Sequence, residues 1–110
     1  MKLIVAIVQD EDSTRLVNKL MEHGFGATKL ATTGGFLRSG NTTLLTGVDD
    51  DRMGDAMKLI ETTCKSRRQM APVHAPMPGS AGMYMSAYPV EVTVGGATVF
   101  VLDVEQFHKF

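Results

Sequence analysis

The segment Leu3–Val8 constrains the fold of this chain most, because it is apolar at six consecutive positions and rich in β-branched residues. A strand with one face in water alternates apolar and polar residues, whereas a strand covered on both faces has no need to alternate. The polar pair Gln9 and Asp10 ends the run. We therefore expect a central strand that is covered on both faces.

Two amphipathic helices are predicted downstream of this strand. The first begins near Asp10 and ends at Gly24, since glycine is the residue most typical of a helix C-terminus. Its apolar positions follow helical spacing at Leu16, Val17, Leu20 and Met21. The second helix follows the acidic run 49–51, which is favourable beside the positive end of a helix dipole. Its apolar face comprises Met53, Ala56, Met57, Ile60 and Cys64.

The remaining sequence predicts strands and two unusual connections. Residues 25–33 and 41–48 are typical of strands and flank a glycine-rich loop. Residues 65–89 hold all 4 prolines of the chain and are predicted as a long loop. Residues 90–94 and 97–104 are expected to pair as a hairpin through a two-residue glycine turn.

This order of elements indicates an α+β fold. Two strand–helix–strand halves and one further strand predict a ferredoxin-like (split βαβ) subunit with an additional C-terminal strand. At 110 residues the chain is expected to form a single domain, 1–110, with a long loop at about 65–89. With both helices on one face, the other face of the sheet needs a cover. Another copy of the chain is the simplest cover, so we expect a homo-oligomer.

Composition narrows the classes of function. The formal net charge is -1, which argues against a polybasic binder of nucleic acid polymers or of a membrane surface. No apolar run is long enough to predict a transmembrane helix, and the N-terminus lacks the features of a signal peptide. The single cysteine, Cys64, excludes an internal disulfide and indicates a cytoplasmic protein.

Residues 28–47 form the densest candidate binding segment. Gly34 and Gly35 let a backbone approach a ligand closely, and successive N–H groups in such a turn can bind an anion. Phe36 offers a ring on which a base can stack, and the amide of Asn41 can pair with an adenine edge. The Thr28 hydroxyl adds a hydrogen-bonding group. The same residues also fit an ordinary glycine turn with a core phenylalanine, and their spacing alone does not separate these alternatives.

Other polar groups are weaker candidates. The carboxylates at 10–12 favour a helix start over catalysis, and Cys64 favours a packed position on a helix. The basic cluster 65–68 is interpreted as a solvated helix end. No metal site is predicted, because the histidines lie far apart without ligand-like spacing, at His23, His74 and His108.

Several segments of the chain resemble the PII-like cyclic di-AMP receptors. The resemblance is carried by Lys29–Leu37, KLATTGGFL, and by Ser39–Thr43, SGNTT. It extends to residues 1–10, to 88–92 and to 95–101, and therefore covers essentially the whole chain. These receptors bind a bacterial second messenger and take part in signal transduction.

The resemblance implies a homotrimer of PII-like subunits that binds cyclic di-AMP in clefts between neighbouring subunits. It implies no enzymatic activity, no cofactor, no metal and a downstream protein target that it does not identify. By position, one wall of the cleft is expected to consist of Thr28, Gly35, Phe36, Leu37, Asn41 and Gly47. Phe100 is expected to meet the ligand in the same cleft.

Two positions depart from the family pattern. Gly26 stands where the family often has an arginine, which removes one contact to phosphate or base. Lys109 stands where the family often has a glutamine, and its ammonium group can restore positive charge near the diester. An alternative function within the same fold is a PII-like sensor of ATP or another adenine nucleotide.

Overall fold

A four-stranded antiparallel sheet, two helices and a projecting hairpin make up the computed structural model, which describes residues 1–30, 40–76 and 84–110. The single 3-10 turn among these residues, η1, spans Asp50–Arg52. The helices and strands, in chain order, are β1 (Lys2–Gln9), α1 (Asp10–Glu22), β2 (Thr28–Leu30), β3 (Asn41–Val48), α2 (Met53–Cys64), β4 (Arg67–Pro76), β5 (Tyr84–Val94) and β6 (Ala97–Asp103).

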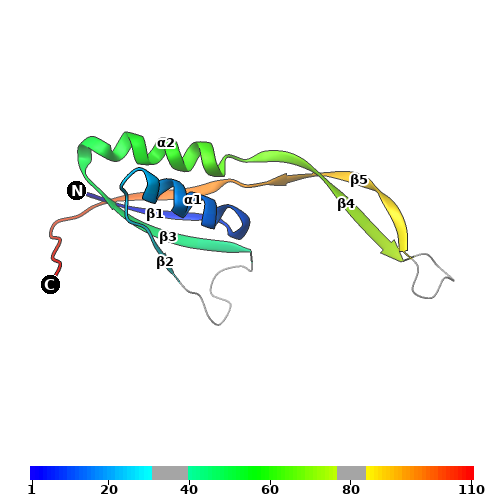
Figure 1. Ribbon diagram of the computed structural model, residues 1–110, viewed down its shortest axis with the longest axis horizontal. Coiled ribbons are helices and arrows are strands. Elements are labelled where there is room, and N and C mark those ends of the chain that lie inside the picture. The colour runs from blue at the N-terminus through cyan, green and yellow to red at the C-terminus, as the bar shows by residue number, and fades with distance from the viewer. Residues whose placement is uncertain (31–39, 77–83) are drawn as a thin grey trace.

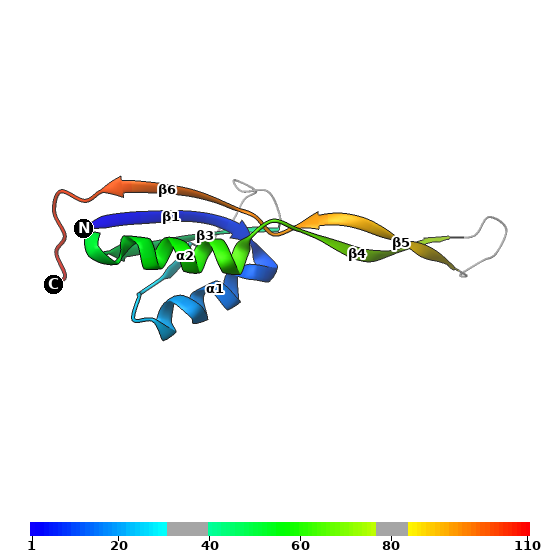
Figure 2. The same cartoon turned by 90° about the horizontal axis from the view of Figure 1, so that it is seen from above.

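The main sheet has the strand order β2-β3-β1-β6, and every neighbouring pair in it is antiparallel. Both helices lie on one side of this sheet (Figures 1 and 2). The predicted α+β, ferredoxin-like arrangement is therefore confirmed, with β1 as a central strand. No helix that the structure describes is long and apolar enough to cross a membrane.

The hydrophobic core lies between the sheet and the helices. Alternate residues of β1, Ile4, Ala6 and Val8, are buried, because successive side chains of a strand point to opposite faces. The predicted apolar faces of the two helices supply the other side of the core, but the prediction is wrong for Met21, which is 63% exposed. Its helical members include Leu16, Leu20, Ala56, Ile60 and Cys64.

The first helix ends as the sequence predicts. Gly24 has a φ of 81°, a left-handed conformation that favours glycine. Its N–H donates to the Met21 carbonyl over 3.0 Å, and the Phe25 N–H donates to the Leu20 carbonyl over 2.8 Å. This pair of hydrogen bonds is the Schellman motif, and the burial of both Leu20 and Phe25 completes it.

The predicted long loop at 65–89 is wrong, because most of this segment is paired strand. β4 and β5 pair antiparallel from Arg67 opposite Val94 to Pro76 opposite Tyr84, with an irregularity between Pro72 and His74. Prolines mislead here because they are excluded from central strands but tolerated in edge strands. In a two-stranded sheet both strands are edges.

The predicted hairpin of residues 90–94 with 97–104 is also wrong. Residues 90–94 belong to β5 and pair with β4, whereas β6 pairs with β1. Gly95 and Gly96, at φ 80° and 92°, instead carry the chain from the hairpin back into the main sheet. Consequently β6 is the fourth strand of the sheet, and the described residues contain no additional C-terminal strand.

The second strand is shorter than its predicted range of 25–33. β2 covers Thr28–Leu30, while Phe25 is buried just after the helix end. Residues 31–33 lie outside the described part of the chain.

The β4–β5 hairpin gives the molecule an elongated shape. Its extents are 65 × 30 × 20 Å and its radius of gyration is 18.7 Å, against roughly 13 Å for a compact chain of about 100 residues. The hairpin projects from one end of the sheet, and both termini lie at the other end (Figure 1). Within the described residues, β4 and β5 contact each other extensively and contact the other helices and strands little. Arg67, at the start of β4, is hydrogen-bonded to Asp12 of α1.

Candidate functional site

The face of the sheet opposite the helices carries every predicted ligand residue that the structure describes. Thr28, Leu45, Val5 and Phe100 stand in one row across the four strands, as the register of each pair requires. Neighbours in such a row point to the same face of a sheet. Alternation along β3 places Asn41 on this face as well, together with the exposed α-carbon of Gly47.

Apolar side chains dominate this open face. Leu3, Val5 and Ile7 of β1 are only partly buried there, whereas the alternate residues of the same strand are fully buried beneath the helices. At the outer strands Leu30, Phe100 and Leu102 are 43%, 54% and 50% exposed. Neither α1 nor α2 covers this face, which agrees with the expectation of a sheet face that needs a cover (Figure 2).

Within one chain, the predicted ligand residues do not form one pocket. Thr28 and Phe100 lie on opposite outer strands, three strand spacings or about 14 Å apart. Asn41 and Gly47 lie at opposite ends of β3, six residues or roughly 20 Å apart. The other predicted members, Gly35, Phe36 and Leu37, lie outside the described residues.

Asn41 borders two hollows on the surface. One, of about 340 Å³, is lined by Gln9, Asn41, Gly95, Thr98 and their neighbours. The other, of about 370 Å³, is lined by Gln9, Asn41 and the residues beside them, Asp10, Glu11 and Gly40. Gln9 and Thr98 were not among the ligand residues predicted from the sequence. The only local sign of a role for Gln9 was its position as a polar residue directly after the apolar run of the first strand.

The junction of β1 and α1 is hydrogen-bonded to the start of β3. The Asp10 N–H donates to the Gly40 carbonyl over 2.8 Å, and the Thr42 hydroxyl donates to the Asp10 carboxylate. These contacts hold the residues around Asn41 against the first turn of the helix. Asp10 and its acidic neighbours occupy that first turn, as predicted.

A buried carboxylate connects the same junction to the hairpin. Asp12 is 1% exposed and accepts hydrogen bonds from Arg67 Nη2 at 2.9 Å and from Arg15 Nη2 at 3.1 Å. The hydrogen bond to Asp12 is the main cause that raises the pKa of Arg67 above its ordinary value. The prediction of a solvated helix end at 65–68 is therefore wrong for Arg67, which begins β4 and binds α1.

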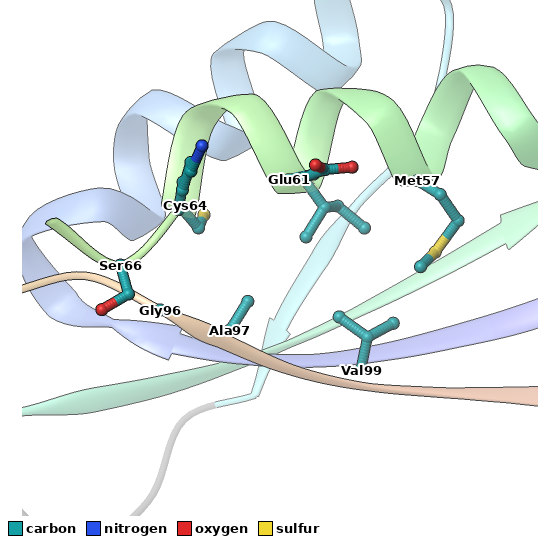
Figure 3. A pocket seen from close by; sticks show the side chains of 9 residues that line it. Met57, Glu61, Cys64, Ser66, Gly96, Ala97 and Val99 are labelled. Atoms are coloured by element: carbon teal, nitrogen blue, oxygen red, sulfur yellow. The ribbon is translucent and has the colours of Figure 1, made fainter.

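A separate cavity of about 390 Å³ lies between α2 and β6 (Figure 3). Met57 and Val99 face each other across it, and Cys64 lines it at the C-terminal end of α2. Burial raises the pKa of the Cys64 thiol to about 11, which disfavours the nucleophilic thiolate. The prediction of Cys64 as a packed side chain is confirmed. None of the predicted ligand residues that the structure describes lines this cavity.

Metal-ligating groups do not cluster in the part of the chain that the structure describes. Nowhere in these residues do three or more His, Cys, Asp or Glu side chains come together in a way that could hold a metal ion. The chemistry that remains at the open face is hydrogen bonding by amide and hydroxyl groups together with apolar and aromatic contact.

Comparisons with known proteins agree with this description. A family model described as Cyclic-di-AMP receptor matches residues 1–110, which is the whole chain. A crystal structure of a protein of unknown function from Pediococcus pentosaceus ATCC 25745 is similar to this chain, with a TM-score of 0.76 and 40% sequence identity. The match covers 99% of this chain and 96% of that one.

Proposed function

This chain belongs to the cyclic-di-AMP receptor family, and we propose that it binds cyclic di-AMP in clefts between the subunits of a homotrimer. The observation that carries the proposal is the placement of Thr28 and Phe100 on the same face but at opposite edges of one sheet. Two residues so far apart meet one ligand most simply when they come from two neighbouring copies. The β6 edge of one subunit then faces the β2 edge of the next.

The apolar open face supports the trimeric assembly. Large exposed apolar patches are uncommon on soluble monomers and mark interaction surfaces. Leu3, Val5, Ile7 and Leu45 together form a continuous apolar strip over the two central strands. Packing three such faces around a common axis covers the strip and forms three equivalent clefts at the sheet edges.

The ligand contacts follow from the chemistry of the residues. The Thr28 hydroxyl and the backbone N–H groups of the glycine-rich segment donate hydrogen bonds to the phosphodiesters. An adenine stacks near Phe36, and Asn41 pairs with the adenine edge through its amide oxygen and nitrogen. Gly47 adds no side chain to the strand surface, where a Cβ atom would lie 2.8 Å from Met1 Cε, and Phe100 approaches from the neighbouring subunit.

Calorimetry with cyclic di-AMP, cyclic di-GMP and ATP tests the ligand. We expect saturable binding of cyclic di-AMP at one site per chain, with much weaker binding of cyclic di-GMP because a guanine edge does not match the Asn41 amide. Preferential binding of ATP would instead support the alternative of an adenine nucleotide sensor. Equal binding of all three would remove the proposed specificity.

The proposed receptor binds its ligand without converting it. Ligand binding changes the conformation of the loops around the cleft, and the changed surface signals to a downstream protein target in the cytoplasm. A ligand can bias such loops only through contacts that differ between the two states. Incubation of cyclic di-AMP with the protein and a divalent metal, followed by chromatography, is expected to return the intact nucleotide.

A further inference from the structure

We propose that Gln9 couples the start of β3, where Asn41 lies, to the base of the β4–β5 hairpin. The inference rests on the proposed function for its ligand and names the route by which that ligand would act on the hairpin. Gln9 is then a positioning residue. Its side chain lies beside Asn41 on one side and is hydrogen-bonded to Gly95 on the other.

Gln9 faces Asn41 directly. It is the last residue of β1 and the register partner of Asn41 on β3. Residues opposite each other on antiparallel strands have Cβ atoms about 4.5–5.5 Å apart on the same face. Both side chains line the same two hollows. A ligand group that reorients the Asn41 amide therefore also changes the surroundings of the Gln9 side chain.

The other end of the Gln9 side chain is bonded to the hairpin. The Gly95 N–H donates to Gln9 Oε1 over 2.7 Å. Gly95 is closely surrounded, because a Cβ atom placed on it would lie 2.7 Å from the Lys65 carbonyl oxygen and 2.6 Å from Arg67 Nη1. Gly95 therefore lies closely packed against the segment that leads into β4.

The two strands of the hairpin are attached to neighbouring parts of one junction. The end of β5 is held at Gln9, and the start of β4 is held at Asp12 through Arg67. The pairing of β4 with β5 carries any change at this base along the hairpin. Because β4 and β5 contact the other described helices and strands little, these two attachments orient the hairpin relative to the main sheet.

Amide hydrogen exchange of the free protein tests the coupling without ligand. We expect Gln9→Ala to accelerate exchange of the Gly95 amide about tenfold, the scale of one lost hydrogen bond. Asn41→Ala is expected to accelerate Gly95 exchange about threefold in the wild-type background and to cause no further acceleration in the Gln9→Ala background. Gln9→Glu keeps an acceptor oxygen, so in the Gln9→Glu background Asn41→Ala should again accelerate Gly95 exchange. Lys2→Ala, at the far end of the same strand, should leave Gly95 exchange unchanged.

Equal effects of Asn41→Ala in both backgrounds, or none in the wild type, would overturn the coupling. A second arm repeats the exchange with saturating cyclic di-AMP, with saturation verified for each variant by calorimetry. We expect the ligand to slow Gly95 exchange in the wild type and not in Gln9→Ala. A wild-type protein that binds no cyclic di-AMP would overturn the proposed function alone, because the free-protein cycle still decides the coupling.

Discussion

At the scale of single residues, the proposed ligand contacts of Asn41 and Thr28 depend on where the backbone places these two side chains. Asn41 is the first residue of β3, and its partly buried side chain faces the open side of the sheet beside Gln9. Thr28 begins β2 and presents its exposed side chain to the same side. Both are polar groups at the margin of an apolar face, where a ligand can pair with them after partial desolvation.

Replacement of Asn41 is expected to weaken the binding of cyclic di-AMP. For Asn41→Ala we predict a loss of about 1–3 kcal/mol in the binding free energy of cyclic di-AMP, because a polar edge of the base is left unpaired. Titration calorimetry measures the loss. Asn18→Ala removes the same amide from an exposed position of α1 and serves as the control. An unchanged affinity in Asn41→Ala would show that this residue does not contact the base.

Introduction of an arginine at Gly26 is expected to strengthen binding. A Cβ atom at Gly26 meets no heavy atom within 4 Å, and its φ lies outside the left-handed region, so the larger residue fits. One added charge-assisted hydrogen bond to a phosphodiester gives about 1.5–3 kcal/mol, most of it lost at high salt. Calorimetry at two salt concentrations checks this.

Gly54→Arg is the matched control for Gly26→Arg. Gly54 is also open around its α-carbon but lies in α2, on the helical side of the sheet. The Gly54→Arg substitution adds the same charge away from the proposed cleft. Similar gains in both variants would indicate a general electrostatic effect in place of a contact at Gly26.

The thiol of Cys64 is expected to be unreactive in the folded protein. Its pKa is raised from 9.0 to about 11 because the side chain is buried, so at pH 8 the thiolate fraction is about a hundredfold below that of the unfolded chain. Iodoacetamide labelling in buffer and in denaturant measures this ratio. Equal labelling rates would contradict the burial of Cys64.

The raised pKa of Cys64 also makes stability depend on pH. Because the folded state holds the thiol proton more tightly, the contribution of this group to the free energy of unfolding is fully present below pH 9 and is lost as the pH rises towards 11.

At the scale of elements, the hairpin depends on its attachment to the start of α1. Asp12 is buried between two arginines, and Arg15 also donates to the Thr63 carbonyl over 2.8 Å. One carboxylate thus joins α1, the end of α2 and the start of β4. The helix start and the hairpin base are consequently one structural unit, although they are 55 residues apart in sequence.

Loss of the Asp12 charge is expected to destabilise this unit. For Asp12→Asn we predict a free energy of unfolding lower by about 1–3 kcal/mol, less than for a fully buried ion pair because both arginines are partly exposed. Urea denaturation measures the change, and limited proteolysis should show earlier cleavage within the hairpin. Glu11→Gln removes a charge from the exposed neighbouring position and should change the stability little. If both variants unfold alike, Asp12 is not the anchor.

At the scale of the whole molecule, the distribution of apolar surface decides assembly. One face of the sheet is buried by α1 and α2, and the other is apolar and is covered by neither helix. The β4–β5 hairpin projects away from this body and does not fold back over the open face (Figure 2). A homotrimer built on the open face would bury it and keep the three hairpins outside.

A charge on the open face is expected to dissociate the proposed trimer. Leu102 and Val101 are neighbours on β6 with similar exposure, 50% and 42%, but they point to opposite faces of the sheet. Leu102→Glu should give a monomer and weaken cyclic di-AMP binding at least tenfold, because burying an unpaired carboxylate in an interface is costly. Val101→Glu should remain trimeric. Light scattering after size-exclusion chromatography distinguishes them, and a monomeric wild type would contradict the assembly itself.

The sequence by itself determined the local elements. The helix over Asp10–Glu22, its end at Gly24 and the strand Asn41–Val48 follow from apolar periodicity and glycine placement, which act between residues close together in the chain. The buried faces of both helices were predicted for the same reason, apart from Met21, which is exposed near the end of the first helix. The resemblance to the receptor family likewise depended only on motifs that can be recognised in order along the sequence.

Only the tertiary structure decided which elements pair and which side chains meet. The partner of residues 90–94, the contact of Arg67 with Asp12 and the link from Gln9 to Gly95 each join distant parts of the chain. Local preferences cannot specify such contacts, because a strand of given sequence can pair with any partner of matching pattern. The register across four strands places Thr28 and Phe100 on one face yet at opposite edges of the sheet, which supports the proposal of a site shared by two subunits.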